Sequence, residues 1–160
     1  MKQIITFFLF IMFGISLSAQ SKANVYKGNS SFSSDVICNI NNGKVYKKNS
    51  SFSSDVICTV NNDKIYKGNS SFSSDVIFTY KDGKVYRGNS SFNSDIVFNI
   101  KNNRIYKANS SFNSDIVANI ENGKVRKGNS SFNSDTMFTI NQPVTITEFV
   151  AIWYAVNYIY

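Results

Sequence analysis

The chain has 160 residues and a formal charge of +7, from 17 Lys and Arg against 10 Asp and Glu. It contains no His, which excludes Ser-His-Asp and Cys-His triads and removes the commonest general base and metal ligand. The basic excess favours an anionic partner such as acidic polysaccharide or nucleic acid, unless the lysines are only charged strand ends that prevent aggregation.

Residues 1–19 have the features of a secretory signal peptide. Lys2 gives a positive start, residues 4–15 are almost wholly apolar, and small residues up to Ala19 offer a cleavage point before Gln20. The apolar run is too short for a comfortable membrane span, and an uncleaved anchor or a buried helix is the alternative. We expect a secreted or cell-surface protein with no membrane contact after cleavage.

Six near-identical 20-residue units follow, from Asn24 to Pro143. Each reads close to K-V-Y-K-G-N-S-S-F-S-S-D-V-I-x-x-I-x-N-G. Units of this kind bury, against their neighbours, apolar surface that one unit could not bury alone. Since every side chain recurs in each unit, any site should be a column of equivalent residues, and we expect neither an enzyme nor a cofactor.

Each unit predicts a β-hairpin. In the first, the β-branched run 36–40 and the run 44–47 flank Asn42-Gly43, and both turn positions of such a hairpin need positive φ. This turn pairs Ile40 with Val45 and predicts that Val36 and Cys38 share their apolar face.

Cys38 and Cys58 occupy the fifteenth position of the first two units, where the other units have Phe or Ala. The position is therefore an apolar packing site. If neighbouring units lie side by side, the two residues either form a disulfide in an exported protein or pack as buried thiols.

One Phe per unit stands alone among Ser and Asn, and we interpret it as a plug into the core. The residues are Phe32, Phe52, Phe72, Phe92, Phe112 and Phe132. Two architectures fit: a β-solenoid in which each unit is one coil, or an array of antiparallel hairpins. We favour the solenoid-like stack of six units because the unit length and the lone Phe suit a coil.

The last unit is more polar, with Arg126, Thr136 and Pro143 in place of Tyr, Val or Ile, and Gly. This predicts an exposed end of the stack. Residues 144–160 then predict a short helix, with Thr145 as N-cap and Glu148 completing a capping box. We expect this helix to cover the open end as an apolar lid, with a partner-binding role as the alternative.

The candidate binding residues are two columns on one face of the hairpins. The aromatic column is Tyr26, Tyr46, Tyr66, Tyr86 and Tyr106, and the basic column is Lys44, Lys64, Lys84, Arg104 and Lys124. One Asp per unit, Asp35 and its equivalents, should cap its loop by accepting backbone N–H bonds, although a weak cation site is the alternative. We predict no metal site.

The units resemble a class of bacterial secreted proteins built from tandem repeats of the form V-Y-x-G-x-S-x-x-S-x-V-I-A-T-I-x-x-G-K. The resemblance covers Asn24 to Pro143 and rests on runs such as Val45-Tyr46 and the residues 74–77. It implies a β-repeat fold and export, and no activity.

These observations predict a secreted, non-enzymatic interaction module that binds a periodic or anionic partner such as envelope polysaccharide. Nucleic acid is a weaker candidate because the chain is expected to be exported. A rival hypothesis is ice or crystal-surface binding through a column of Asn and Thr at the sixteenth position of the unit, and a third is a structural spacer without a ligand. That column is Asn39, Thr59, Thr79, Asn99, Asn119 and Thr139.

Overall fold

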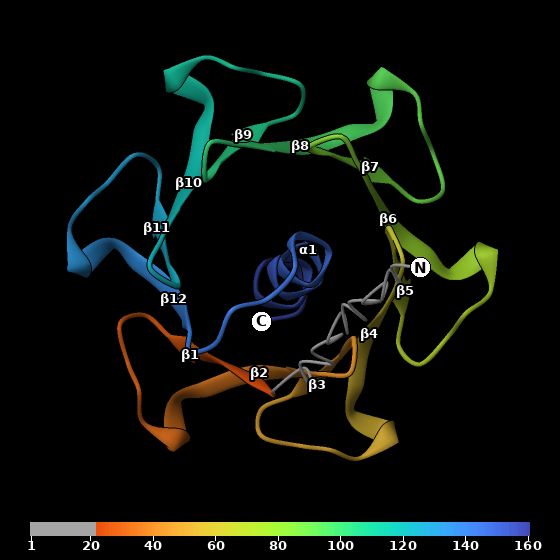
Figure 1. The fold of residues 1–160 in the computed structure, drawn as a ribbon, viewed down its shortest axis with the longest axis vertical. Helices are drawn as coiled ribbons and strands as arrows, with labels where there is room; N and C mark the ends of the chain where they lie inside the picture. The colour runs from red at the N-terminus through yellow and green to blue at the C-terminus, as the bar shows by residue number, and fades with distance from the viewer. Residues whose placement is uncertain (1–21) are drawn as a thin grey trace, which may run out of the picture.

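A computed structural model describes residues 22–160, so the predicted signal peptide lies outside the described residues. The described chain forms twelve antiparallel strands that close into a ring around one helix (Figure 1). The strands are β1 Ala23–Lys27, β2 Val36–Asn41, β3 Lys44–Lys47, β4 Val56–Asn61, β5 Lys64–Lys67, β6 Val76–Lys81, β7 Lys84–Arg87, β8 Ile96–Lys101, β9 Arg104–Lys107, β10 Ile116–Glu121, β11 Lys124–Lys127 and β12 Thr136–Ile140. The helix is α1 Ile146–Tyr154, and a π-helical turn continues it over Ala155–Ile159.

Two-residue turns join β2 to β3 and the equivalent pairs. Asn42 and Gly43 have φ of 50° and 70°, and Ile40 lies opposite Val45 as predicted. Each turn also bonds to the next hairpin: the amide of Val60 donates to the Gly43 carbonyl at 2.7 Å. The hairpins are therefore linked side by side into one sheet.

Long loops join the odd-numbered strands to the following even-numbered ones, and a β-bulge accompanies each. Between β1 and β2 the bulge pairs Tyr26 with Val36, while Val25 pairs with Cys38. The prediction that Val36 shares the inner face with Cys38 is therefore wrong. Ile37 packs against the central core instead, because the extra residue of a bulge shifts the alternation of side chains by one.

The strands close into a barrel, and the favoured solenoid is wrong. Strand β1 pairs with β12 in register Val25 to Ile140, and the hairpin array that we considered as the alternative is the closer description. The last unit consequently has no exposed end. Its Arg126 and Thr136, predicted to face solvent, are only 6% and 8% exposed.

The width of the barrel explains the helix. Eight strands enclose a lumen that side chains just fill, whereas twelve strands spaced about 4.8 Å apart give a backbone diameter of at least about 18 Å. An α-helix with its side chains is about 10–12 Å across. Helix α1 lies inside the ring in Figure 1, so it fills the lumen along the axis and is not the lid that the sequence predicts.

The capping box predicted at the start of α1 is present. The Glu148 amide donates to Thr145 Oγ1, and the Thr145 amide donates to Glu148 Oε2 at 2.9 Å. Val144 packs against the core just before this cap. These contacts turn the chain from β12 into the lumen.

Fifteenth-position side chains surround the helix, and their sizes differ as the helix requires. Helix α1 contacts β2, β4 and β5, where Cys38 and Cys58 are small and fully buried. Cys58 Sγ lies 3.7 Å from the carbonyl oxygen of Ala151. On β8 and β12 the larger rings of Phe98 and Phe138 lie about 6 Å from Trp153 (centroids 5.9 and 6.3 Å), whereas β10 has the small Ala118 at this position.

Both cysteines are free thiols. Strand β3 separates β2 from β4, and Cys38 and Cys58 lie opposite different residues of β3, so their two Cα atoms are at least about 9 Å apart, beyond the limit of about 7 Å for a disulfide. Burial raises the pKa of the Cys38 thiol to about 12, and burial followed by the nearby Cys38 raises the pKa of Cys58 as well. Both thiols are small side chains that leave space for the helix, and Cys58 Sγ also donates a weak hydrogen bond to the Ala151 carbonyl.

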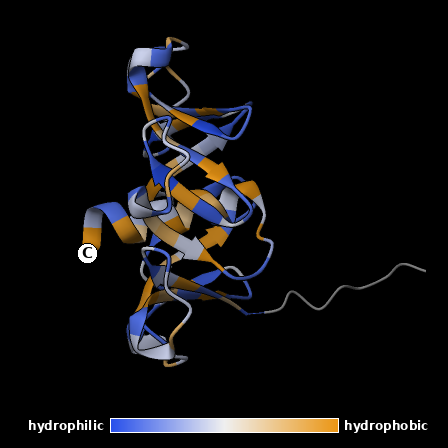
Figure 2. Ribbon diagram, turned by 90° about the vertical axis from the view of Figure 1, so that its left-hand side faces the viewer, coloured by the Kyte–Doolittle hydropathy of each residue, from blue (hydrophilic) through white to orange (hydrophobic). Residues whose placement is uncertain are grey.

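The barrel has two different faces. We call the face with the tight turns the turn face, where residues 142–146 enter the lumen beside Gly123. The opposite face, the loop face, holds the long loops and the end of the helix, which projects from it in Figure 2. Among residues 22–160, no helix is long and apolar enough to cross a membrane.

Candidate functional site

Six long loops radiate from the ring (Figure 1). Each loop contains one Phe. They span residues 28–35, 48–55, 68–75, 88–95, 108–115 and 128–135. Every one of these Phe side chains is 71–72% exposed. The prediction that they plug the core is therefore wrong: the described structure displays six large apolar groups to solvent at equivalent positions.

Hydrogen bonds within each loop hold this conformation. In the first loop Ser30 Oγ donates to Asp35 Oδ2 at 2.5 Å and accepts from the Phe32 amide at 3.2 Å. The Asp35 amide donates to the Phe32 carbonyl at 2.9 Å, closing a single 3₁₀ turn. Asp35 does close the loop, as predicted, but it accepts from a serine hydroxyl and not from a backbone amide. These hydrogen bonds join the loop residues to one another, and the Phe32 ring remains exposed to solvent.

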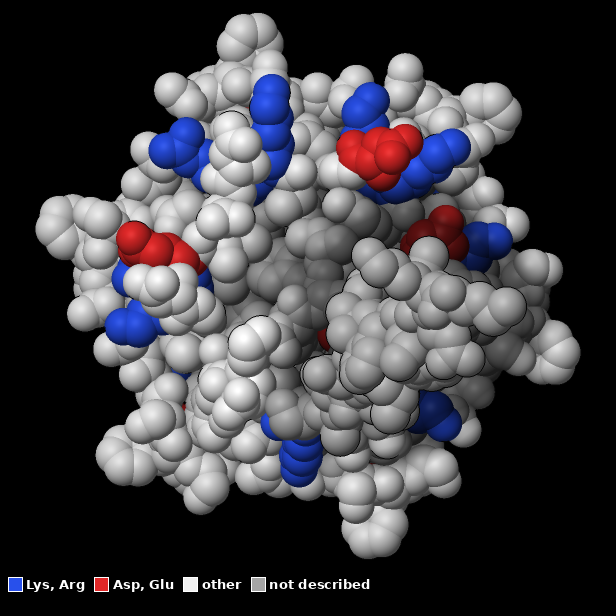
Figure 3. Space-filling model, viewed as in Figure 1, with Lys and Arg blue, Asp and Glu red and all other residues white. Residues whose placement is uncertain are grey.

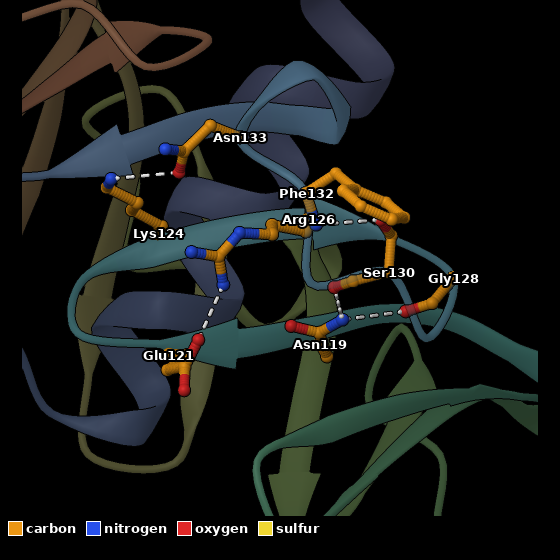
Figure 4. Close-up of polar contacts among 8 residues, drawn as sticks. All are labelled: Asn119, Glu121, Lys124, Arg126, Gly128, Ser130, Phe132 and Asn133. Atoms are coloured by element: carbon orange, nitrogen blue, oxygen red, sulfur yellow. Dashed lines mark hydrogen bonds and ion pairs between the residues drawn. The ribbon is translucent and has the colours of Figure 1, made fainter.

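The sixteenth-position residues anchor the loops to the barrel. Asn119 Nδ2 donates to the carbonyls of Gly128 and Ser130, at 3.2 and 2.7 Å (Figure 4). Thr139 Oγ1 donates to the Gly28 carbonyl at 2.8 Å and so anchors the first loop across the ring closure. The ice-binding hypothesis gives these Asn and Thr side chains the role of a surface that matches a crystal lattice. In the structure, the side chains described here donate hydrogen bonds to backbone carbonyls of the loops.

The predicted aromatic column lies on the outer wall of the barrel beneath the loops. Tyr26, Tyr66, Tyr86 and Tyr106 are only 6–9% exposed, and Tyr46 is half-buried. In the last unit Arg126 takes this position and forms a 2.8 Å ion pair with Glu121 (Figure 4). The tyrosine side chains therefore expose only a small part of their surface to a ligand.

The predicted basic column is half-buried at the sides of the loops. Lys124 Nζ donates to Asn133 Oδ1 of its own loop at 3.2 Å (Figure 4). Arg104 lies in a 340 Å³ groove whose other walls include Asn103, Asn119 and residues 129–131 of the next loop. Glu121 also lines this groove, so a cation, a carboxylate, amides and hydroxyls lie together in a site suited to a polar ligand.

Basic side chains recur around the turn face, with acidic groups beside some of them (Figure 3). Among the described residues, no group of three or more His, Cys, Asp or Glu is placed to hold a metal ion.

The family model of the 6-fold beta flower protein matches residues 25–153. The chain belongs to the 6-fold beta flower family. None of the curated proteins and none of the solved structures gives a significant match. The match confirms that the chain is a tandem β-repeat protein. We call the six long loops of this beta flower protein its petals.

Sequence reasoning missed the petal phenylalanines as surface groups. A signal was present, because Phe32 stands among four Ser residues that have no apolar partner nearby in sequence. Ser and Asp bond readily to neighbouring backbone or side-chain groups and so build self-contained loops. In a beta flower protein such a loop needs no core contact at its tip.

Proposed function

We propose that this protein is an exported, non-enzymatic module that binds a periodic anionic polymer, such as an envelope polysaccharide, through its petals. The observation that carries the proposal is the 71–72% exposure of all six petal Phe side chains. Isolated exposed apolar residues are common, but six on equivalent bonded loops form one repeated surface.

Each petal combines the groups that such a polymer would require. A Phe ring offers an apolar platform for the C–H face of a sugar, and the exposed Asn29 and Ser31 of the same petal offer hydrogen bonds to hydroxyl groups. Lys27 and its equivalents, also exposed, supply positive charge at the base of each petal. Contacts at one petal would be weak, but linked contacts can raise the overall affinity about 10²- to 10⁴-fold.

The test is co-sedimentation of the chain from residue 20 onward with insoluble envelope polysaccharide, at low and high salt. Replacing one Phe, as in Phe32→Ser, should weaken binding only about twofold, whereas replacing all six should lower it at least about 100-fold. Val117→Thr is the matched control, because Val117 is also exposed, at 39%, but lies outside the petals. Circular dichroism checks that the variants fold.

Raising the salt concentration should weaken binding if the Lys and Arg side chains take part. A six-fold Phe variant that binds like the unmodified chain would overturn the role of the petals. A chain that binds at no salt concentration would favour the structural spacer. Thermal hysteresis without polysaccharide binding would favour the ice-binding rival.

A further inference from the structure

Two neighbouring clefts on the loop face flank Tyr160, where the projecting helix end leans over the first two petals. The first, of 530 Å³, is lined by Lys27, Lys48, Asp35, the aliphatic side chains of Val36, Ile37 and Val156, and Ser34 and Tyr160. The second, of 550 Å³, is lined by Lys47, Lys48, Asp55, Ile159, Tyr160, Asn49 and Ser50. Both volumes lie within the range of about 300–1,000 Å³ for small-molecule sites.

The charges in both clefts favour an anion. Each is lined by two Lys ammonium groups and one Asp side chain, whose carboxylate stays negatively charged while it accepts a hydrogen bond from a petal serine, at 2.5 Å for Asp35 and 2.6 Å for Asp55. Among residues 22–160 the only ion pair joins Arg126 and Glu121. Lys27, Lys47 and Lys48 are therefore not neutralised by a contact partner in the described structure.

Lys48 is held in a conformation that a lysine adopts at a cost. Its φ is 49°, whereas four of the other five units have Gly at this position. A left-handed conformation disfavours every residue with a Cβ. The backbone here is fixed on both sides: the Lys48 amide donates to the Ile37 carbonyl at 2.9 Å, and Asn39 Nδ2 donates to the Lys48 carbonyl at 2.8 Å. Replacing Lys48 by Gly should therefore relieve strain in the backbone.

We infer that the first cleft binds a single-chain amphipathic carboxylate, a fatty acid. Its carboxylate lies between the ammonium groups of Lys27 and Lys48, and its alkyl chain lies along Ile37, Val156 and Tyr160. Val36, Ile37 and Val156 give this cleft an aliphatic wall, whereas the groove beside Arg104 is lined mainly by polar side chains. The site shares Lys27 with the base of the first petal but includes none of the petal Phe side chains, so it can be tested separately from the polysaccharide proposal.

The test is calorimetric titration of the chain from residue 20 onward with laurate, below the concentration at which laurate forms micelles. We expect saturable binding of one laurate per chain. Shortening the chain to decanoate and octanoate should weaken binding by about two- to fourfold for each methylene removed. Dodecanol, which has the same chain length without the carboxylate, should bind at least about tenfold more weakly.

Two substitutions separate strain from binding. Lys48→Gly removes both the strained conformation and the ammonium group, so it should raise the melting temperature and weaken laurate binding at least about fivefold. Ala108→Gly is the matched control: Ala108 has the same φ of 49° but lies far from the cleft in the fifth petal, so it should raise the melting temperature and leave laurate binding unchanged. Lys27→Gln, at an exposed position, should weaken binding without changing stability.

Three results would overturn the inference: no saturable laurate binding, unchanged affinity in Lys48→Gly, or equal binding of dodecanol. The chain with all six petal Phe residues replaced should still bind laurate. Loss of polysaccharide binding with retention of laurate binding in that variant would support both sites separately. Failure of laurate binding alone would leave the petal proposal standing.

Discussion

Replacing Cys58 by Phe tests whether the helix occupies the lumen. Three of the six units already have Phe at this position, so the change makes the second unit more like the others. In an open stack or a hairpin array with the helix as a lid, it should be neutral or stabilising. In the closed barrel the outcome is the opposite, because α1 lies directly against Cys58.

The magnitude follows from the contact. Cys58 Sγ and the Ala151 carbonyl oxygen are 3.7 Å apart, which is van der Waals contact, and both residues are fully buried. The phenyl ring adds five heavy atoms that have no space without moving the helix. Overpacking of a well-packed core costs about 1–3 kcal/mol, and we expect the upper end, about 3 kcal/mol, because the closed ring cannot widen locally.

Urea unfolding followed by circular dichroism and by the fluorescence of Trp153 measures the change in the free energy of unfolding. For a chain of this size, 3 kcal/mol corresponds to a fall of about 6–12 °C in melting temperature. Cys58→Ala is the control, since it keeps the space for the helix and should cost only about 1 kcal/mol. A Cys58→Phe chain as stable as the unmodified one would refute the packing of α1 against β4.

The remaining predictions concern the backbone, the helix cap and the thiols. Gly68→Ala should lower the free energy of unfolding by about 1 kcal/mol because φ at this position is 55°, even though the new Cβ would lie at an ordinary distance of 3.9 Å from the nearest backbone oxygen. Ala108→Gly should raise the free energy of unfolding by about 0.5–1 kcal/mol, because φ of Ala108 is 49°. Equal stability of these two variants would contradict the argument from φ. Thr145→Ala should cost about 1 kcal/mol in urea unfolding, with Thr145→Ser nearly neutral, because only the hydroxyl accepts the Glu148 amide. The thiols of Cys38 and Cys58 should resist a thiol reagent at pH 8 until the chain is unfolded. Because burial raises the pKa of Cys38 from 9.0 to about 12, the folded state binds more protons than the unfolded state between those values, and stability measured against pH should fall above about pH 9; a flat profile would contradict the burial.

The local structure of each unit could be predicted from the sequence, because it depends on residues close together in the chain. Asn42-Gly43 sets the register of Ile40 against Val45, and Thr145 with Glu148 sets the start of the helix. Both are short-range backbone effects that the residue types determine. The prediction for Val36 failed at the bulge, which no residue type marks in the sequence.

The closure of the ring could not be predicted from the sequence. The apolar face of each hairpin indicates that this face is buried, but it does not indicate which part of the chain packs against it. The fifteenth position did hold the relevant information. Its residues are small in the first, second and fifth units and large in the third, fourth and sixth, a difference that an open stack of equivalent coils gives no reason for. A helix in the lumen that contacts β2 and β4 accounts for the small residues of the first two units, whereas these contacts do not explain Ala118 of the fifth unit.

The same asymmetry gives the molecule two kinds of surface. The petals repeat around the ring and suit a partner that is itself repeated, because the loop bonds from Ser30 to Asp35 recur in all six. The helix end breaks the repetition, since the two clefts beside Tyr160 lie between it, the first two petals and the adjoining Lys27 and Lys47. A six-fold scaffold with one helix in its lumen can therefore present a multivalent site and a single site without adding a second domain.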